Sequence, residues 1–421
     1  MPPRPRVPSP LERENLRSQT RAWLDEGVVE KTEPLPWVNN TVFVAKSNGG
    51  IRVCIDCTPS NIVTKDYDWP LPRLQDLRHH LGGARWFARI DLRSAFFRIR
   101  VPRSVRPLVA YRCDGNDYWF KRMPFGLKTA PAVFQRYMDH LLAPVKDICF
   151  WYIDDVLVFA SNKEEVRRRT RKVEAIITQG GNDVATEKCE YEKRGLLFAG
   201  MWIYGGGVGP NHLKVEQALR LPIPKTKTEK QSALGLVSYL RDHVPLASML
   251  TASLTLGKDN TMNEEEYALE WNKLTTHIAD RISTLGEWGQ DEDADLFVDA
   301  SKTGCAAILI QSGRIICLAS RKLTPAETRY SATDREQLGL LLAAKKMRTF
   351  LHRPLGTTRV WTDHAALLGR KTNDMTPRQA RWHETVNQWI RQPMHVRGKN
   401  NPADFVSRWG LGTVGGQIST I

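Results

Sequence analysis

Two adjacent carboxylates interrupt one of the most apolar stretches of the chain. Asp154 and Asp155 lie within residues 148–159, which read as two strands joined by a short turn. Aspartate is an ordinary turn residue, but two neighbouring carboxylates repel each other unless a cation neutralises them. A third carboxylate, Asp91, follows the strand predicted over 86–90. Three carboxylates at neighbouring strand ends suit a site in which two Mg²⁺ ions promote phosphoryl transfer.

A second group of four acids lies in the last third of the chain. Each ends a predicted strand or begins a predicted helix, and each has an ordinary structural explanation. Glu336 with Thr333 fits a helix capping box, and an aspartate after Pro402 suits a helix N-terminus. Because all four lie at such positions within one predicted α/β unit, the arrangement favours a functional site. The four acids are Asp299, Glu336, Asp363 and Asp404.

The elements predicted around the first group form a mixed α and β region. Alternating apolar residues around Asn48-Gly49-Gly50 indicate a β-hairpin, and paired glycines are typical of helix ends. The expected elements are a helix through about Glu26, hairpin strands over Thr41–Lys46 and Ile51–Ile55, a helix over Leu71–Leu81 closed by Gly82-Gly83, a strand over Trp86–Ile90, a helix after Pro131 and a helix that carries Arg167–Lys172 and ends at Gly180-Gly181.

A change in composition separates the two groups of acids. Residues 222–230 are rich in Pro, Lys and Thr and mark a boundary, and two helical stretches follow up to about Ile282. The polar segment 286–295 reads as a linker. A new alternating pattern begins at Leu296. It predicts three short strands up to about Arg321, a long helix over Asp334–Leu351, a strand that ends at Asp363 and further helices.

The charge of the chain narrows the class of partner. Its 421 residues include 61 Lys and Arg against 46 Asp and Glu, which gives a net charge of +15. Such an excess suits a polyanion, and nucleic acid is the first candidate. On charge alone, a ribosome-associated protein or a merely basic surface is an equal alternative.

Cysteine content and apolar runs indicate the compartment. Seven scattered cysteines argue against a disulfide framework. Cys54 and Cys57 have zinc-knuckle spacing but no second ligand pair, so both are read as strand residues. No run approaches the roughly 20 apolar residues that span a membrane, and Met1–Arg6 lacks the apolar core of a signal peptide. We therefore expect an intracellular protein with no membrane partner.

Four blocks around the first acids resemble, in the same order, those of gypsy-type LTR-retrotransposon reverse transcriptases. The resemblance extends over about Leu11 to Arg408. The blocks are Trp69-Pro70-Leu71-Pro72-Arg73 with Leu81-Gly82-Gly83-Ala84 and Ile90-Asp91-Leu92-Arg93-Ser94-Ala95-Phe96; Met123-Pro124-Phe125-Gly126-Leu127 with Ala130-Pro131 and Phe134-Gln135; Tyr152-Ile153-Asp154-Asp155; and Lys188-Cys189-Glu190-Tyr191 with Phe198-Ala199-Gly200.

The second group of acids resembles the Asp, Glu, Asp, Asp pattern of ribonuclease H. Residues 401–408, Asn-Pro-Ala-Asp-Phe-Val-Ser-Arg, resemble the closing motif of the same retrotransposon enzymes. The resemblance implies two Mg²⁺ per active site, for which Mn²⁺ could substitute. The implied catalytic and metal-binding residues are Asp91, Asp154 and Asp155 in the polymerase and Asp299, Glu336, Asp363 and Asp404 in the nuclease.

The resemblance also implies contacts to the incoming nucleotide. Lys46 and Arg52, on the two sides of the hairpin, would contact the triphosphate, and Phe96 would lie under the sugar. The alternatives are solvated hairpin charges and a core aromatic ring. At Cys57 and Thr58 the sequence departs from the family pattern of an aromatic residue and an arginine, which puts one template contact in doubt.

The expected architecture is an α+β polymerase right hand followed by an α/β ribonuclease H-like domain. Fingers and palm are expected over 1–222, thumb and linker over 223–290, ribonuclease H over 291–410 and a flexible tail over 411–421. The implied function is DNA synthesis on RNA and DNA templates with degradation of the RNA strand of hybrids. The implied partners are an RNA template, a DNA primer, the RNA–DNA hybrid and dNTPs, with an asymmetric homodimer on substrate left open. A cytoplasmic location is expected, with virus-like particles and nuclear access also open.

Two other functions compete with this one. A nucleic-acid-binding protein that has lost catalysis should lack some of the seven acids, and all seven are present. A polymerase that incorporates ribonucleotides is disfavoured by the ring of Phe96. His395 reads as an ordinary strand histidine rather than a catalytic one.

Overall fold

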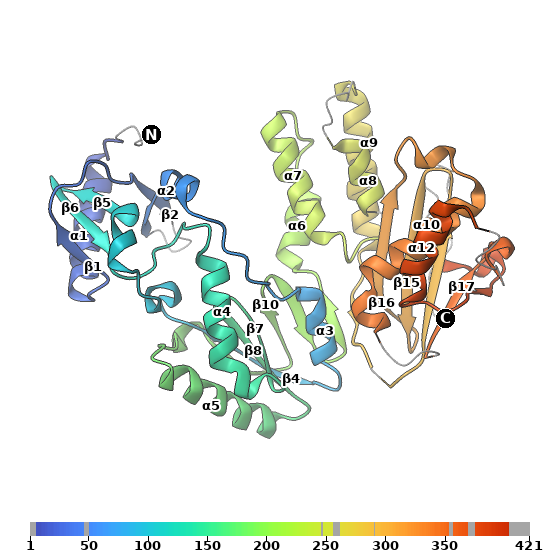
Figure 1. Ribbon diagram of the computed structural model, residues 1–421, viewed down its shortest axis with the longest axis horizontal. Coiled ribbons are helices and arrows are strands. Elements are labelled where there is room, and N and C mark those ends of the chain that lie inside the picture. The colour runs from blue at the N-terminus through green and yellow to red at the C-terminus, as the bar shows by residue number, and fades with distance from the viewer. Residues whose placement is uncertain are drawn as a thin grey trace. The chain divides into compact units, whose positions relative to one another are not determined.

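The computed structural model describes residues 6–45, 50–245, 247–255, 262–289, 291–352, 357–368 and 375–403. The chain forms two compact units (Figure 1). The first unit consists of Met1–Leu74 and Trp86–Lys193, and the second of Gln75–Arg85 and Arg194–Ile421. Within the described ranges, no helix is long and apolar enough to cross a membrane.

The N-terminal part of the first unit packs one helix on a small antiparallel sheet. Ser9 caps the helix because its hydroxyl accepts the Glu12 N–H, while the Glu12 carboxylate accepts the Ser9 N–H. The buried ring of Trp23 meets Tyr111 and Phe120 edge to face. The elements are α1 (Pro10–Asp25), the sheet β1 (Val29–Thr32), β6 (Asn116–Phe120) and β5 (Ala110–Cys113), the separate hairpin β2 (Thr41–Ala45) and β3 (Ile51–Ile55), and α2 (Thr58–Val63).

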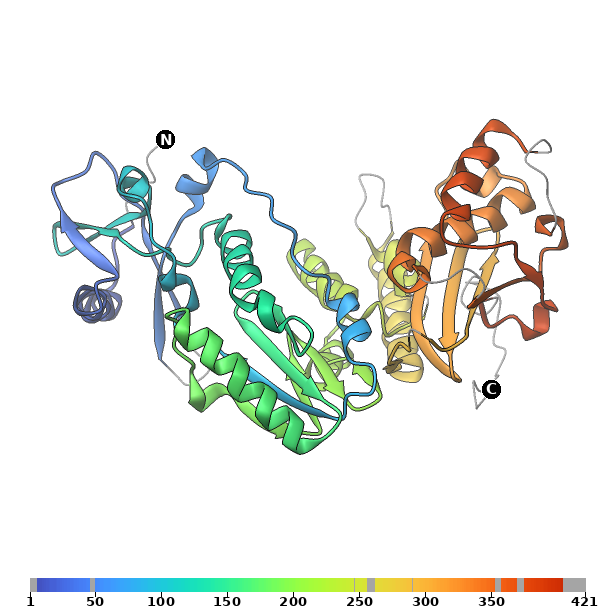
Figure 2. The same cartoon turned by 60° about the horizontal axis from the view of Figure 1, so that its bottom comes forward.

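A four-stranded antiparallel sheet carries the first group of acids. Its order is β7-β8-β4-β9, and two helices lie against it (Figure 2). Val156 and Val158 of the sheet belong to the same core as Phe134, Met138 and Val173 of the helices. The elements are β7 (Cys149–Tyr152), β8 (Asp155–Ala160), β4 (Trp86–Asp91), β9 (Glu190–Lys193), α4 (Ala130–Leu142) and α5 (Lys163–Gln179), with the short helices η2 (Ala95–Arg98), η3 (Arg103–Val109), η4 (Ala143–Val145) and η5 (Thr186–Lys188).

The second unit begins with a small sheet and a group of helices. Capping boxes start α7 at Thr226 and α9 at Asn263, so sequence signals fix both helix beginnings. The elements are η1 (Leu74–Asp76) and α3 (Leu77–His80), the sheet β10 (Gly195–Phe198), β11 (Met201–Tyr204), β12 (Gly207–Gly209) and β13 (Leu285–Gly286), and the helices α6 (His212–Arg220), α7 (Lys227–Leu240), α8 (Ala247–Leu254) and α9 (Glu264–Arg281).

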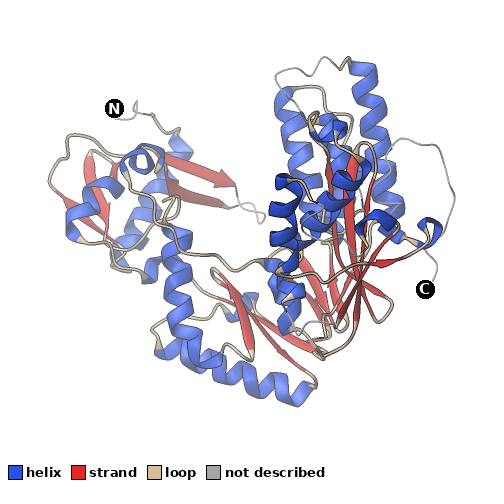
Figure 3. Ribbon diagram, turned by 45° about the vertical axis from the view of Figure 1, so that its right-hand side comes forward, coloured by secondary structure: helices blue, strands red, loops and turns tan. Residues whose placement is uncertain are grey.

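A five-stranded mixed sheet forms the centre of the region that contains Asp299, Glu336 and Asp363 (Figure 3). Its order is β16-β15-β14-β17-β18, with β14–β17 and β17–β18 parallel. The elements are β14 (Ala294–Ala300), β15 (Gly304–Gln311), β16 (Arg314–Lys322), β17 (Thr358–Thr362), β18 (Met394–His395), η6 (Glu327–Arg329), α10 (Ala332–Lys346), α11 (Arg348–Leu351), η7 (Ala365–Leu367), α12 (Pro377–Asn387) and η9 (Gly398–Asn400).

Strand β15, which lies between β16 and β14, is buried on both faces. Cys305 and Ala307 share a core with Leu338 of α10, whereas Ala306 and Ile308 share a core with Trp271 of α9. Its continuous apolar run, Gly-Cys-Ala-Ala-Ile-Leu-Ile, is typical of a strand covered on two sides. The five-stranded sheet therefore lies between the helices that follow it and the helices that precede it in the chain.

Three sequence predictions differ from the structure. The helix predicted over Leu71–Leu81 is limited to the turns η1 and α3, because Pro70 and Pro72 exclude helical geometry before them. The three strands predicted to be short have 7, 8 and 9 residues. The segment 286–295, predicted as a linker, contains the buried Trp288 and is held by hydrogen bonds between Gln311 and the backbone of Gly289.

Candidate active sites

A β-hairpin turn carries the first two acids, and the neighbouring helix holds its conformation. Tyr152 at the end of β7 is paired with Asp155 at the start of β8. Between them, Ile153 has a left-handed φ of 57°, which is costly for a β-branched residue. Its N–H donates to Oε1 of the buried Gln135 on α4 at 2.8 Å. This hydrogen bond stabilises the turn and so orients Asp154.

The third acid lies on the adjacent strand. Asp91 is directly opposite Asp155 in the β4–β8 ladder. The carbonyl of Asp91 accepts the Ala185 N–H at 2.9 Å, and its own N–H contacts Sγ of Cys189 at 3.4 Å. Nζ of Lys188 lies 3.8 Å from Oδ1 of Asp91. Lys188 belongs to one of the family-like motifs of the sequence, but no sequence signal predicted that its charge lies beside the acids.

The electrostatics of this site favour a cation. Reduced hydration raises the pKa of Asp154, and the charge of Asp91 raises it further, while Lys188 opposes the shift. The side chain of Asp154 nevertheless remains accessible at the tip of the turn. A cation from solvent can therefore reach these acids and relieve their mutual repulsion.

Phe96 follows Asp91 on the short helix η2. Ser94, just before this helix, has a left-handed φ of 50° and turns the chain sharply after the strand. The ring of Phe96 is partly buried and meets Phe125 and Phe134 edge to face at 5.2 and 5.4 Å. Phe96 as a residue is only half-buried. The predicted contact with the sugar is compatible with this position.

Of the two predicted triphosphate contacts, one lies among the described residues. Arg52 is exposed on β3, opposite Val44 in the β2–β3 ladder. Lys46 lies outside the described residues, so its position stays a prediction.

The prediction that both cysteines of the Cys54–Cys57 pair are strand residues is half wrong. Cys54 lies in β3, but Cys57 is the N-cap of α2, and Thr58 begins that helix. The Cys57 thiol is buried 3.7 Å from the carbonyl of Phe125, and burial raises its pKa to about 12. At the position where the family usually has an aromatic residue, Cys57 is a packed, unreactive thiol.

The acids of the nuclease come together at one edge of its sheet. Asp299 is on β14, Glu336 on α10, and Asp363 directly follows β17. Because β14 and β17 are parallel neighbours, their carboxyl ends meet at the same edge. One ligand atom from each acid lies within 4.8 Å of the others, and the described residues contain no second such group of three. Asp404, the fourth predicted acid, lies outside the described residues.

Local geometry frees Glu336 to reach this group. Ser331, rather than Thr333, caps α10 by accepting an N–H of its first turn. The predicted capping box of Thr333 and Glu336 is therefore wrong. A Cβ on Gly339 would lie 3.3 Å from the carbonyl oxygen of Asp299, so the glycine lets the helix approach β14 closely.

The environment of Glu336 fits a hard divalent cation. Its Oε1 accepts the Ala300 N–H at 3.2 Å, whereas the buried Oε2 has no hydrogen-bond partner among the described residues. Burial, followed by the charges of Asp299 and Asp363, raises the pKa of Glu336 to about 9. A cation held by the three carboxylates would neutralise this repulsion and use the unpaired oxygen as a ligand.

Two further groups support the nuclease acids and were missed by sequence analysis. Nε2 of His364, directly after Asp363, lies 3.0 Å from Oγ1 of Thr333 and joins the end of β17 to α10. The sequence signal that could have identified His364 is its position directly after a predicted catalytic acid. The other supporting residue is Asp334, two residues before Glu336.

Asp334 joins α10 to α12. Its buried carboxylate accepts a hydrogen bond from Arg378 at 3.1 Å and another from Gln379. The guanidinium of Arg378 lies 3.9 Å from the ring centroid of Tyr330 and 5.4 Å from that of Trp382. This arrangement fixes the first turn of α10.

Replacing Arg378 by alanine should lower the free energy of unfolding by about 1–3 kcal/mol, because a charge-assisted hydrogen bond and a cation–π contact are lost. Burial opposes ionisation of Asp334, but hydrogen bonds from Gln379 and Ser331 and the charge of Arg378 hold its pKa below the usual value. A carboxylate with a lowered folded pKa stabilises the protein above its unfolded pKa and loses this contribution as pH falls. Urea unfolding at pH 7 should therefore separate Arg378→Ala from wild type more than unfolding at pH 3. Arg381→Ala, an exposed change on the same helix, is the control; equal losses in both variants would contradict the prediction.

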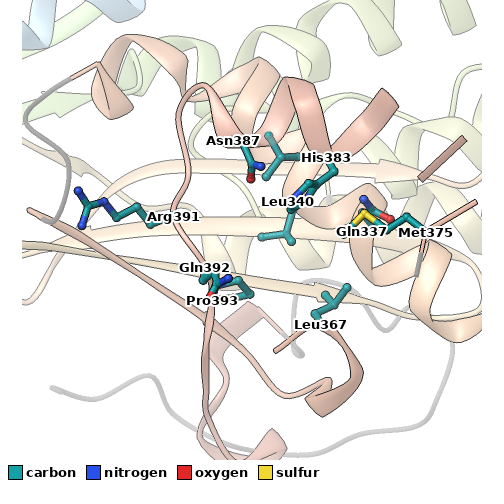
Figure 4. A pocket seen from close by; sticks show the side chains of 10 residues that line it. Gln337, Leu340, Leu367, Met375, His383, Asn387, Arg391, Gln392 and Pro393 are labelled. Atoms are coloured by element: carbon teal, nitrogen blue, oxygen red, sulfur yellow. The ribbon is translucent and has the colours of Figure 1, made fainter. Parts of the chain in front are cut away.

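A small pocket lies between α10, α12 and residues 391–393 (Figure 4). Gln337 and Leu340 line it from α10, and His383 and Asn387 line it from α12. None of the predicted site residues lines this pocket, so the carboxylate group rather than the pocket is the candidate site.

Two family profiles match the chain. Residues 44–203 match the family described as reverse transcriptase (RNA-dependent DNA polymerase), and residues 290–389 match the RNase H-like domain found in reverse transcriptase. The first range contains the three acids of the hairpin and β4, and the second contains the three clustered acids of the nuclease. The chain therefore contains a reverse transcriptase domain followed by a ribonuclease H-like domain.

Curated relatives match the chain over most of its length. The Transposon Tf2-3 and Tf2-7 polyproteins of Schizosaccharomyces pombe are 27% and 26% identical over 412 residues. The matches cover 93% of this chain and 30% of each polyprotein, so the chain spans about a third of the length of these relatives. These relatives are retrotransposon polyproteins of the gypsy type, which agrees with the resemblance found in the sequence.

Solved structures confirm the predicted fold. A foamy viral protease-reverse transcriptase described in complex with dsDNA has a TM-score of 0.80 at 19% identity and covers 95% of this chain and 86% of its own. The foamy viral enzyme described in complex with RNA/DNA hybrid also has a TM-score of 0.80, at 17% identity, and covers 100% of this chain and 58% of its own. The predicted α+β right hand with a following ribonuclease H-like domain is confirmed.

Proposed function

We propose that this chain synthesises DNA on RNA and DNA templates, degrades the RNA strand of RNA–DNA hybrids and so copies retrotransposon RNA into DNA. The observation that carries the proposal is the presence of two separate carboxylate sites, one in each matched domain. The solved foamy viral relatives, described with dsDNA and RNA/DNA hybrid, support duplexes of both kinds as ligands. The net charge of +15 suits such ligands.

Mg²⁺ is the proposed cofactor at both sites, with Mn²⁺ as a substitute. Asp91, Asp154 and Asp155 would hold it in the polymerase, and Asp299, Glu336 and Asp363, with Asp404 from the sequence pattern, would hold it in the nuclease. Bound there, the metal supplies Lewis-acid activation of oxygen nucleophiles and stabilisation of phosphate charge.

The protein's own residues orient these reactions. Gln135 holds the hairpin turn, while Lys188 offsets part of the acid charge next to the primer and nucleotide. In the nuclease, the backbone N–H of Ala300 orients Glu336. Each site thus presents fixed carboxylate oxygens to the phosphate chemistry.

Primer extension and hybrid cleavage test the function directly. The folded protein should extend a DNA primer on RNA and on DNA with Mg²⁺ and dNTPs, and should shorten the labelled RNA of a preformed hybrid. Ribonucleotides should extend the primer poorly. Binding of the duplex without either reaction in Mg²⁺ or Mn²⁺ would favour a non-catalytic nucleic-acid-binding protein.

Selection of the sugar is proposed to depend on Phe96. A ring under the sugar occupies the space of a 2′-hydroxyl, so Phe96→Val should raise ribonucleotide incorporation roughly tenfold or more relative to dNTPs, a change of about 1.4 kcal/mol. If the ring serves only as core packing, the cavity should instead cost about 2–4 kcal/mol of stability and depress both substrates together. The measurement is kcat/KM for matched dNTPs and rNTPs with thermal unfolding alongside. Phe97→Val, one residue further in the same turn, is the control.

An asymmetric homodimer on substrate is a further part of this proposal. Between α9 and β14 the described residues form only the short strand β13, which leaves little room for an additional connecting domain. A second copy could therefore supply the nuclease for a hybrid held by the first. Light scattering at saturating hybrid duplex should give the mass of two chains per duplex, and a mass of one chain would contradict the dimer.

A further inference from the structure

A short two-stranded ribbon beside the polymerase site concentrates arginine side chains on one face. Arg100 and Arg122 are directly opposite each other in an antiparallel bridge. The hydrogen bonds on either side, Val101 N–H to Lys121 carbonyl and Met123 N–H to Ile99 carbonyl, are both 2.8–2.9 Å long. They make Arg100 and Arg122 a non-hydrogen-bonded pair, in which opposing side chains leave the same face close together.

This pair brings like charges together without a carboxylate between them. Among the described residues, neither Arg100 nor Arg122 forms an ion pair, and the same holds for the exposed Arg103 that follows. A guanidinium nitrogen of Arg122 donates to the carbonyl of Arg98 at 3.3 Å. Like charges directly opposite each other destabilise a ribbon, so the pairing is unfavourable unless an anion lies between them.

The ion pairs of the ribbon leave most of its positive charge uncompensated. Arg98 pairs with Asp183, and Glu30 accepts from Arg106 and lies 3.8 Å from Lys121. Residues 98–106 and 121–122 therefore carry a total of six cations, with two carboxylates as their ion-pair partners among the described residues. The cations are Arg98, Arg100, Arg103, Arg106, Lys121 and Arg122.

The ribbon is continuous with the polymerase site. Arg98 ends the short helix that carries Phe96, and its partner Asp183 belongs to the segment that holds Asp91. In that segment the Asp183 carbonyl accepts the Arg93 N–H at 2.8 Å, and the Ala185 N–H donates to Asp91 at 2.9 Å. From Phe96 to Arg100 the chain can span at most about 14 Å. An anion on the ribbon would therefore lie near the site of nucleotide addition.

We propose that Arg100 and Arg122, with the exposed Arg103 three residues after Arg100 in the chain, form a polyphosphate-binding site that captures the triphosphate of the incoming nucleotide before it reaches the acids. Guanidinium groups bind phosphate oxygens in bidentate geometry, and a cluster of them attracts a highly charged anion over several ångströms. The nucleotide part of this inference rests on the proposed polymerase function, whereas the phosphate site itself does not. The other phosphate source is the backbone of the template strand.

Binding of inorganic tripolyphosphate, which has neither base nor sugar, tests the site without catalysis. Calorimetry in EDTA should show that the double variant Arg100→Gln/Arg122→Gln binds at least about tenfold more weakly than wild type. Arg171→Gln/Lys172→Gln removes the same charge from the exposed face of α5 and should bind like wild type. Equal weakening in both double variants would overturn the site, because it would show only a general effect of charge.

Thermal unfolding checks the ribbon itself. At low ionic strength and without phosphate, Arg100→Gln/Arg122→Gln should unfold at the same or a higher temperature than wild type, since the repulsion is removed. A clear decrease would show that the two guanidiniums are already satisfied within the protein and would overturn the argument for an anion. Tripolyphosphate should raise the unfolding temperature of wild type more than that of this variant.

Steady-state kinetics separates the two sources of phosphate. If the triphosphate is captured, the dNTP KM of Arg100→Gln/Arg122→Gln should rise several-fold, kcat should change less, and the Kd of the primed template should match the α5 control. A raised template Kd with an unchanged dNTP KM would overturn capture of the nucleotide in favour of the template backbone. Failure of every variant, wild type included, to extend a primer would count against the polymerase function and would leave the calorimetric result standing.

Discussion

Asp154→Asn should abolish DNA synthesis and leave cleavage of a preformed hybrid intact. Asp154 lies on a turn that Gln135 holds rigidly, opposite the strand of Asp91, and its charge is one of three available to hold a divalent cation. Removing one anionic ligand from such a site costs several kcal/mol of transition-state stabilisation, so a loss of at least about 10³-fold is expected.

The measurement is single-turnover primer extension with Mg²⁺ on an RNA template, with hybrid cleavage assayed in the same preparation. Asp147→Asn, an exposed change shortly before β7, removes the same charge outside the site and should retain both activities. Extension by Asp154→Asn within tenfold of wild type would show that this acid is not part of the polymerase site. Loss of both activities together would instead point to misfolding.

Glu336→Gln should have the opposite effect on the two reactions. It removes one of three carboxylates that lie within 4.8 Å of each other, so hybrid cleavage should fall by at least about 10³-fold while extension persists. Glu384→Gln, exposed on α12, is the matched control. If Glu336→Gln still cleaves the hybrid at a near-normal rate, the assignment of the nuclease site is wrong.

The same substitution should stabilise the metal-free protein. Burial and the neighbouring acids raise the pKa of Glu336 from 4.5 in the unfolded chain to about 9. Because its pKa is raised in the folded state, the contribution of Glu336 to the free energy of unfolding is greatest below pH 4.5. This contribution is lost as pH rises toward 9. At pH 8 in EDTA, Glu336→Gln should therefore unfold with a free energy higher by on the order of 1–3 kcal/mol. The gain should disappear at pH 4, and Mg²⁺ should stabilise wild type more than the variant.

The elements that carry the acids could be predicted from sequence because their signals are local. Apolar runs on both sides of Asp154-Asp155 gave the hairpin, and the strand that ends at Asp91 followed from the same pattern. Paired glycines after a charged helix correctly indicated the end of α5 at Gly180. At these positions, local propensity and tertiary structure agree.

Errors around the nuclease acids arise where a neighbour far away in the sequence decides the outcome. Thr333 could have capped α10, but its hydroxyl contacts His364, and Ser331 takes the cap instead. The pairing of Asp334 with Arg378 joins residues 44 positions apart, which no local pattern reveals. The residues that orient and support a site depend on such long-range contacts and are hard to predict from sequence. The acids of the site can be identified without them.

The burial of β15 on both faces limits how this protein can be divided. A fragment that begins at residue 291 would keep the face beneath α10 but would expose Ala306, Ile308 and Leu318 to water. An uncovered apolar sheet face promotes self-association and poor solubility. The two reactions can be separated by single substitutions, yet the nuclease takes part of its interior from upstream helices. The two active sites can therefore be inactivated one at a time, but the ribonuclease H-like domain shares its core with the helices that precede it.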